Sequence, residues 1–304
     1  MITLTFIKSS KPKLGVKTKR GILEVQRVVE KMKQSHHDVS TYPLTVQELV
    51  AAESAEHALK DILDFSESLD ESFFLDESEI QYGPSVVNPQ KIICVGLNYK
   101  PHVEESRMEL PDYPILFSKF NNALIGNESE VSIPTHSTQV DYEAELAIVI
   151  GKEAKDVKKE DALSYVYGYT IANDLSARDL QFLTSQWLLG KSCDGFCPLG
   201  PYLVTKDEIA NPNELGIKTY VNEDIRQNSN TSKMIFNCEK LISFISSHMT
   251  LFPGDVILSG TPEGVILGYE KSERVWLKNG DIISIEIDGL GKLTNIIKDQ
   301  NEIW

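Results

Sequence analysis

Cysteine is scarce in this sequence of 304 residues, and so are long apolar stretches. The four cysteines, at positions 94, 193, 197 and 238, are too few and too scattered for a disulfide framework. Cys193 and Cys197 lack the second Cys or His pair of a zinc site, so we expect free thiols. No segment approaches the roughly 20 apolar residues that cross a bilayer, and the N-terminus lacks the features of a secretory signal. The sequence therefore predicts a soluble, cytoplasmic protein without a membrane span.

Positive charge is also scarce. The chain has 30 Lys and Arg against 45 Asp and Glu, which gives a formal net charge of −15. The segment from Glu53 to Glu79 contains ten acidic residues and a single basic one, Lys60. Phosphate binding needs clustered Lys and Arg, so we expect no nucleic-acid partner. The acidic segment is most simply a solvated surface, but it leaves open a non-catalytic role in which this region binds a protein partner.

Residues 1–87 predict a small N-terminal α+β domain. Strand patterns occur at Ile2–Lys8, Leu14–Thr18 and Gly21–Val25. Thr45 and Glu48 have the spacing of a capping box, which predicts a helix from Thr45 to about Phe65. The polar, Pro-containing stretch from Tyr82 to Pro89 then has the composition of a linker.

Residues 88–304 predict a second domain that is dominated by sheet, because short apolar or alternating runs are separated by Gly, Pro, Asn and Asp. The expected strands are Lys91–Gly96, Pro114–Phe120, Ala144–Gly151, Gly168–Ala172, Tyr202–Val204, Ile217–Val221, Asp255–Ser259, Ile282–Ile287 and Leu293–Ile297. Helices are expected at Lys159–Val166, after Ser176 and at Cys238–Met249. The fold class is therefore a β-dominated α+β protein.

Three carboxylates carry the strongest functional signal. Glu143 and Glu145 alternate along an expected strand, so both project from one face, where two unpaired negative charges would repel. Asp174 follows another apolar run. Alone, the two glutamates are explained as a solvated strand face and Asp174 as a helix N-cap. Together they predict a site for a hard divalent ion, Mg²⁺ or Mn²⁺, which prefers oxygen ligands and keeps positions open for substrate.

A histidine, a fourth carboxylate and several cations accompany these residues. On a helix, the spacing of three between His102 and Glu105 places both side chains on one face, within reach of a hydrogen bond. A carboxylate fixes the tautomer of an imidazole and raises its basicity, so the pair is a candidate general base, although a surface salt bridge has the same spacing. Lys119, Arg178 and Lys191 are candidate anion receptors, or alternatively surface cations.

Five sequence blocks resemble the successive signatures of the fumarylacetoacetate hydrolase superfamily, in the family's order. They are Asn98–Glu105, Asp141–Ala147, Gly168–Gln181, Lys191–Pro201 and Pro253–Gly264. The resemblance extends from about Lys91 to Ile297 and is strongest to a bacterial branch of acylpyruvases and oxaloacetate decarboxylases. It implies a β-sandwich roll, a homodimer, one bound Mg²⁺ or Mn²⁺, and a small substrate with a pyruvate-like end.

Position by position, the resemblance also implies roles for individual residues. The metal ligands would be Glu143, Glu145 and Asp174. The catalytic residues would be His102 and Glu105, on a mobile lid, together with Lys191. Arg178, Gln181, Lys191 and Thr261 would lie around the bound 2-oxo acid, and we expect Lys119, a candidate anion receptor, to bind the substrate as well.

These features predict metal-dependent cleavage of a C–C bond in a 2-oxo acid. The metal, chelated by the acid, accepts electron density as an enolate forms, and nearby cations stabilise its charge. Decarboxylation of oxaloacetate to pyruvate and CO₂ and hydrolysis of an acylpyruvate by activated water both proceed from this enolate. Isomerisation or decarboxylation of a dienedioate from aromatic catabolism is an alternative at the same site.

Overall fold

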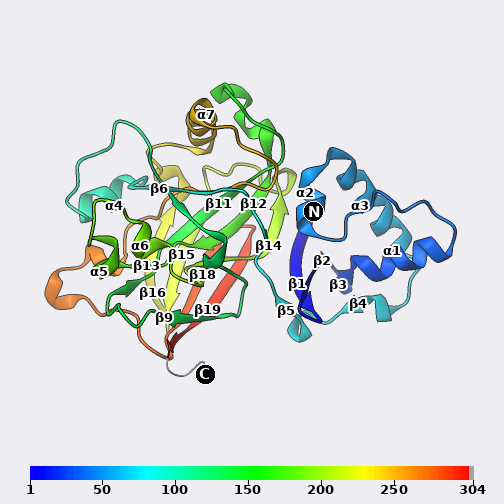
Figure 1. The fold of residues 1–304 in the computed structure, drawn as a ribbon, viewed down its shortest axis with the longest axis horizontal. Helices are drawn as coiled ribbons and strands as arrows, with labels where there is room; N and C mark the ends of the chain where they lie inside the picture. Colours follow the sequence, from blue (N-terminus) through cyan, green and yellow to red (C-terminus); the bar gives the residue numbers. More distant parts are fainter. Residues whose placement is uncertain (301–304) are drawn as a thin grey trace.

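The computed structural model describes residues 1–300, and its N-terminal region is a strand meander covered by helices (Figure 1). The strands are β1 (Ile2–Lys8), β2 (Lys11–Thr18), β3 (Gly21–Glu24), β4 (Phe74–Leu75) and β5 (Gln81–Tyr82). The helices are α1 (Val25–Gln34), α2 (Val46–Ala51) and α3 (Glu53–Ser66). Val28 and Met32 of α1 pack with Leu14 and Val16 of β2 and with Leu59 of α3, so helices and strands share one apolar core.

The prediction of one helix from Thr45 to Phe65 is wrong. The capping box is present, with the Thr45 hydroxyl accepting the Glu48 N–H at 3.2 Å, but the chain is extended at Ala52 (φ −141°, ψ 129°) and a second helix follows. The buried residues of α2 are Val46, Leu49 and Val50. If the helix continued without a break, helical periodicity would place the next positions of this face at residues 53 and 57. The buried apolar positions of α3 are instead Ala55, Ala58, Leu59 and Ile62, so the break lets both segments bury their apolar faces.

Two sheets form the rest of the protein. The large sheet has twelve strands, of which ten follow the order β4-β3-β2-β1-β14-β12-β11-β17-β6-β7, while β5 pairs with β1 and β8 with β14. Its strands beyond the N-terminal region are β6 (Ile92–Gly96), β7 (Ile115–Lys119), β8 (Leu124–Ile125), β11 (Ala144–Ile150), β12 (Val166–Asn173), β14 (Cys197–Thr205) and β17 (Val256–Leu258). The second sheet has the order β16-β15-β18-β19-β9. Its strands are β9 (Glu130–Ile133), β15 (Gly216–Val221), β16 (Asp224–Asn230), β18 (Ile282–Ile287) and β19 (Gly291–Asp299).

The two sheets bury one apolar core between them. Leu146 and Ile148 of β11, Ile171 of β12, Ile285 of β18 and Leu293 of β19 are all inaccessible or nearly so. A short pair, β10 (Val140–Asp141) and β13 (Ser176–Ala177), lies next to the ends of β11 and β12. The predicted class, a β-dominated α+β protein with a sandwich of sheets, is confirmed.

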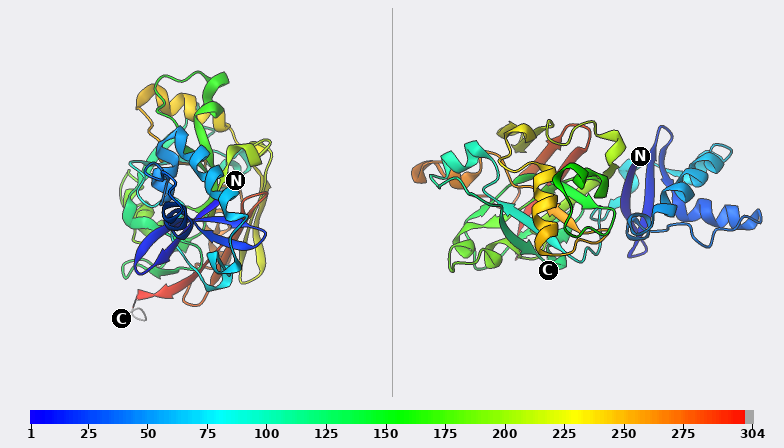
Figure 2. Two further views of the ribbon diagram at one scale, coloured as in Figure 1. Left: turned by 90° about the vertical axis from the view of Figure 1, so that its right-hand side faces the viewer. Right: turned by 90° about the horizontal axis from the view of Figure 1, so that it is seen from above.

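The N-terminal region is joined to the large sheet. It lies at one end of the molecule (Figure 2), where β1 pairs antiparallel with β14, Thr3 opposite Leu203. The stretch expected to be a linker is packed, because Ser85 and Val86 are buried and the Ser85 N–H donates to the Leu199 carbonyl at 3.0 Å. The domain boundary near residue 87 stays a prediction, but a shared sheet connects the two regions.

Two strands of the second sheet have no counterpart among the expected strands. β16 reads Asp-Ile-Arg-Gln-Asn-Ser-Asn and has no apolar alternation, whereas β9 alternates Glu-Val-Ser-Ile but is only four residues long. The helix expected at Lys159–Val166 is a 3₁₀ segment over Lys159–Tyr165, whereas α7 (Cys238–His248) is close to its prediction. The four cysteines are free, as expected. No helix formed by residues 1–300 is long and apolar enough to span a membrane.

A polar cluster where the N-terminal region meets β14 provides a stability test. The Glu77 carboxylate accepts from Lys17 Nζ at 2.8 Å and from the Tyr82 hydroxyl at 2.7 Å, and it also accepts from the Tyr202 hydroxyl. Because these groups are partly exposed, we expect Glu77→Gln to lower the free energy of unfolding by about 1–2 kcal/mol, measured by urea denaturation. The control is Glu79→Gln, an exposed position on the same turn, and equal stability of both variants would contradict a role for the cluster.

Candidate metal centre and active-site cavity

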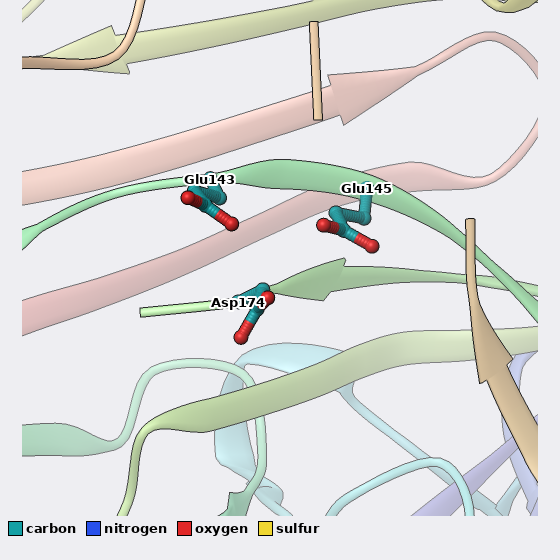
Figure 3. A group of neighbouring side chains, drawn as sticks. All are labelled: Glu143, Glu145 and Asp174. Carbon is teal, nitrogen blue, oxygen red and sulfur yellow. The ribbon is translucent and has the colours of Figure 1, made fainter. Parts of the chain in front are cut away.

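Sheet pairing brings the three predicted carboxylates together. β11 runs antiparallel to β12 with Ala144 opposite Asn173, so the start of one strand lies beside the end of the other. Glu145 extends from the first strand, Glu143 from the chain just before it and Asp174 from the chain just after the second, and their carboxylates converge (Figure 3). The Asp174 N–H donates to the Glu143 carbonyl at 2.9 Å, which fixes the backbone of both residues.

The three carboxylates fit a divalent ion. One oxygen from each lies within 4.8 Å of the others, and all three side chains are buried. Burial, together with the charges of Asp174 and Glu143, raises the pKa of Glu145 well above its usual value. Like charges held this close away from water need a positive partner. An all-oxygen donor set of this kind matches the preference of Mg²⁺ and Mn²⁺.

Three cations neutralise part of this charge, namely Lys191, Arg178 and Lys119. Lys191 Nζ lies 2.6 Å from Glu143 and 2.7 Å from Asp174, and Arg178 Nη2 lies 2.7 Å from Glu143. Although burial opposes ionisation of Glu143, Lys191 and Arg178 hold its pKa well below the usual range. Burial likewise disfavours the charged form of Lys191, but Asp174 and Glu143 outweigh it and raise the pKa of the ammonium group. The ion pair between Lys191 and Glu143 is therefore charged at neutral pH.

Lys119 lies behind the carboxylates. Its side chain is fully buried, with Nζ 2.7 Å from Asp174, and it donates to the carbonyls of Leu175, Phe196 and Lys191. Lys119 does not line the cavity described below. Its contacts hold Asp174 and the backbone around Lys191 in place.

Asp141 is a functional residue for which the sequence analysis gave no role. It is fully buried, and its carboxylate lies 2.8 Å from Arg178 Nη2. The same carboxylate accepts the backbone N–H groups of Ile266 and Leu267 at 2.8 and 3.0 Å. Its position two residues before Glu143 in the same block was the available signal. Arg178 also donates to Gln181 Oε1 at 2.9 Å.

Gln227 on β16 was also missed. Its amide donates to Thr261 Oγ1 at 2.9 Å and accepts from the Ala144 N–H at 3.0 Å, which connects Thr261 to the strand of the carboxylates. Gln227 is completely buried. The sequence offered no signal for it, because the strand that holds it has no apolar pattern.

The predicted hydrogen bond between His102 and Glu105 is present. Both lie on α4 (Lys100–Glu105), with His102 Nδ1 2.7 Å from Glu105 Oε1. The other oxygen of Glu105 accepts the Gly264 N–H at 2.9 Å, which fixes the orientation of the carboxylate. His102 is buried by the protein but lines the cavity.

These groups open onto one cavity of about 650 Å³. Of the ten residues selected from the sequence, nine line it, namely His102, Glu105, Glu143, Glu145, Asp174, Arg178, Gln181, Lys191 and Thr261. Apolar side chains, including Phe117, Phe182, Trp187 and Leu267, form part of its wall. The cavity therefore combines a candidate metal centre, a candidate proton-transfer pair and fixed cations.

The family model for the fumarylacetoacetate (FAA) hydrolase C-terminal domain matches residues 91–298. The chain belongs to the fumarylacetoacetate hydrolase family. Over 249 residues it is 48% identical to the mitochondrial oxaloacetate tautomerase fahd2 of Xenopus laevis, covering 81% of this chain and 76% of that protein. The superfamily resemblance found in the sequence is confirmed.

Two solved structures of this fold are also similar. The maleylpyruvate hydrolase of Sphingobium sp. SYK-6, in complex with manganese (II) ion and pyruvate, has a TM-score of 0.77 and 28% identity, covering 98% of this chain and 99% of that one. The 2-hydroxyhepta-2,4-diene-1,7-dioate isomerase of Mycobacterium marinum has a TM-score of 0.65 and 37% identity, covering 74% and 81%. Relatives with the same fold thus carry names of different reactions.

Proposed function

We propose that this protein is a divalent-metal-dependent enzyme that interconverts the enol and keto forms of oxaloacetate. The observation that carries the proposal is the convergence of the three carboxylates and the His102–Glu105 pair on one cavity. The 48% identity to a protein named oxaloacetate tautomerase supports the choice of substrate and reaction. Tautomerisation also makes the smallest demand on the site, because it moves one proton and breaks no C–C bond.

In this proposal Glu143, Glu145 and Asp174 hold Mg²⁺ or Mn²⁺, which when bound supplies Lewis-acid polarisation of the 2-oxo acid. Arg178 and Lys191 provide fixed positive charge for the substrate carboxylate and for charge that develops on its 2-oxygen. Lys119 acts through Asp174, which it positions, and Gln181 and Thr261 line the pocket beside these groups.

His102 is the proposed proton-transfer residue. Glu105 accepts from Nδ1, so the imidazole offers Nε2 to the substrate. His102 takes the proton from C3 of the keto form, and a proton returns to the 2-oxygen to give the enol. The reverse sequence gives the keto form, so no other reactant is required.

Cleavage of a C–C bond, as predicted from the sequence, is the second candidate. Oxaloacetate decarboxylation and acylpyruvate hydrolysis start from the same enolate, and a relative named maleylpyruvate hydrolase shares the fold over nearly the whole chain. Dienedioate isomerisation is a third possibility at the same cavity, and a similar structure has that name.

One assay separates these reactions. Enol oxaloacetate is added to the protein with Mn²⁺ or with EDTA, and the ultraviolet absorbance of the enol and the release of pyruvate are followed together. We expect metal-dependent loss of the enol signal without matching pyruvate. Equimolar pyruvate would show that decarboxylation dominates, and parallel assays with an acylpyruvate and a dienedioate test the remaining reactions. No turnover of any substrate by metal-loaded protein would contradict an enzymatic role.

We also propose the homodimer that the family resemblance implies. Exposed apolar side chains lie just after β7 and along the segment from α5 (Arg178–Gln181) to α6 (Leu188–Lys191), namely Phe120, Phe182, Leu183, Leu188 and Leu189. A second copy that covers them would remove this apolar surface from water. We expect Leu189→Glu to weaken dimerisation at least about tenfold, measured by light scattering over a range of concentrations. Ile225→Glu on β16 is the control, and an unchanged dimer in Leu189→Glu would exclude this face.

A docking role for the acidic N-terminal segment stays a prediction. Deleting residues 1–87 would uncover β14, since β1 pairs with it, so neutralising substitutions are the better test. If the acidic surface binds a basic partner, replacing Asp70 and Glu71 by Asn and Gln should reduce partner capture without changing turnover.

A further inference from the structure

Two arginines of the cavity, Arg107 and Arg274, have no part in the proposed chemistry, and within the described part of the chain only Arg107 has a carboxylate partner. Arg274 lines the cavity wall on the loop between β17 and β18, at a half-buried position. Its Nε donates to the Tyr269 carbonyl at 2.9 Å, which fixes the direction of the guanidinium group. Within residues 1–300, no hydrogen bond or ion pair engages its two terminal nitrogens. The two terminal NH₂ groups of the Arg274 guanidinium are therefore held in a fixed direction and are available to donate hydrogen bonds to a ligand.

The other strong cations of the cavity are already engaged. Lys191 pairs with Glu143 and Asp174, and Arg178 with Asp141 and Glu143. At the cavity mouth, Arg107 is paired with Glu270. Lys271 lines the mouth too, but it is exposed, so water and salt screen its charge.

The loop that carries Arg274 is held in place by the catalytic region. Asp141 accepts the Ile266 and Leu267 N–H groups with the same carboxylate that binds Arg178. The Arg107–Glu270 ion pair ties the loop to the chain just after α4 (the orange segment beside α4 and α5 in Figure 1). The loop that carries Arg274 is thus held relative to the carboxylates by the hydrogen bonds to Asp141 and, at the surface, by the exposed Arg107–Glu270 pair.

We infer that Arg274 binds the distal carboxylate of a dicarboxylic 2-oxo acid whose other end lies at the three carboxylates. The inference rests on the proposed function, since it assumes that the 2-oxo acid end binds there. A cavity of about 650 Å³ is much larger than a four-carbon diacid, and its apolar wall of Phe117, Phe182 and Trp187 suits the hydrocarbon part of a longer chain. A guanidinium group whose terminal nitrogens have no other partner binds a carboxylate through two parallel hydrogen bonds.

Binding of matched acids tests this inference without relying on turnover. The probes are 2-oxohexanedioate and 2-oxohexanoate, which share chain length and differ in the distal group. Affinities for Mn²⁺-loaded protein are measured by calorimetry. Wild-type protein should bind the diacid at least about tenfold more tightly, and Arg274→Gln should remove that preference while leaving the monoacid unchanged. Arg274→Lys, which retains charge but not the fork, should lose part of the preference.

The control variant is Lys278→Gln, which removes one positive charge from the same loop at an exposed position outside the cavity. It should keep the wild-type preference. If wild-type protein and Arg274→Gln bind the two acids in the same ratio, Arg274 has no such role and the proposed function stands. If wild-type protein binds neither acid, the inference fails, whereas the proposed function is decided separately by the oxaloacetate assay described above.

Discussion

Replacing Glu145 by Gln is expected to abolish metal-dependent turnover and to leave the metal-free protein at least as stable as the wild type. Burial, Asp174 and Glu143 all disfavour the Glu145 carboxylate when no cation is bound, so a neutral amide relieves that repulsion. Gln also keeps an oxygen that accepts the Gly260 N–H, which Glu145 accepts at 2.8 Å. The same change removes one of three anionic ligands, so affinity for the metal and turnover should each fall at least about a hundredfold.

Thermal unfolding with and without Mn²⁺ separates the two effects. A ligand at one hundred times its dissociation constant stabilises the folded state by about 2.7 kcal/mol, so the wild type should show a clear metal-dependent rise in melting temperature. Glu145→Gln should lose most of that rise. Glu153→Gln, at an exposed position shortly after β11, should retain it. A metal response of wild-type size in Glu145→Gln would falsify the assignment of the metal centre.

The local sequence was sufficient to predict which site residues lie close together when they are separated by only two or three positions in the chain. The alternation of Glu143 and Glu145 follows from strand periodicity, and the contact between His102 and Glu105 follows from helical spacing. Both were found as expected. The place of Asp174 beside Glu143 required the antiparallel pairing of β11 and β12, which the family resemblance supplied and the spacing did not.

Residues whose partners lie far away in the sequence could not be predicted. Asp141 depends on a loop 125 residues further along the chain, and Gln227 depends on a strand without an apolar pattern. Lys119 was expected to contact substrate because its charge is visible in the sequence, whereas its full burial and its backbone carbonyl partners are products of packing. Arg274 became a candidate only when the cavity wall was known.

The break at Ala52 and the packed stretch at Ser85 also depend on contacts with residues distant in the sequence, so the local sequence did not predict them. A propensity pattern across residues 45–65 favours one helix, but the apolar faces of α2 and α3 are out of phase, and tertiary packing decides. Pro and Gly near Ser85 favour a linker, but its neighbour Val86 is buried in the core. Local composition therefore indicated a helical region at 45–65 and an irregular stretch around Ser85, but not the residues against which either one packs.

Substitution of His102 is expected to reduce turnover strongly without weakening metal binding, unlike substitution of Glu145. We expect His102→Gln to lower kcat by about 10²–10⁴-fold, because positioned proton transfer contributes that much, while Mn²⁺ affinity stays within about twofold of the wild type. His102 is not one of the three residues of the candidate metal centre. Turnover under saturating substrate and calorimetric titration of Mn²⁺ measure the two quantities. A parallel loss of metal affinity would assign His102 to the metal centre instead.

Glu105 should act only through His102. A Gln at position 105 can keep one oxygen for the Gly264 N–H, but its amide NH₂ then faces His102 Nδ1 and favours the wrong imidazole tautomer. We therefore expect Glu105→Gln to reduce kcat by about 10–100-fold, and the double variant to be no slower than His102→Gln alone. Glu104→Gln, an exposed position on the same helix, is the matched control and should behave as wild type. Multiplicative losses in the double variant would mean that Glu105 contacts the substrate independently, and the pair would then be two separate groups.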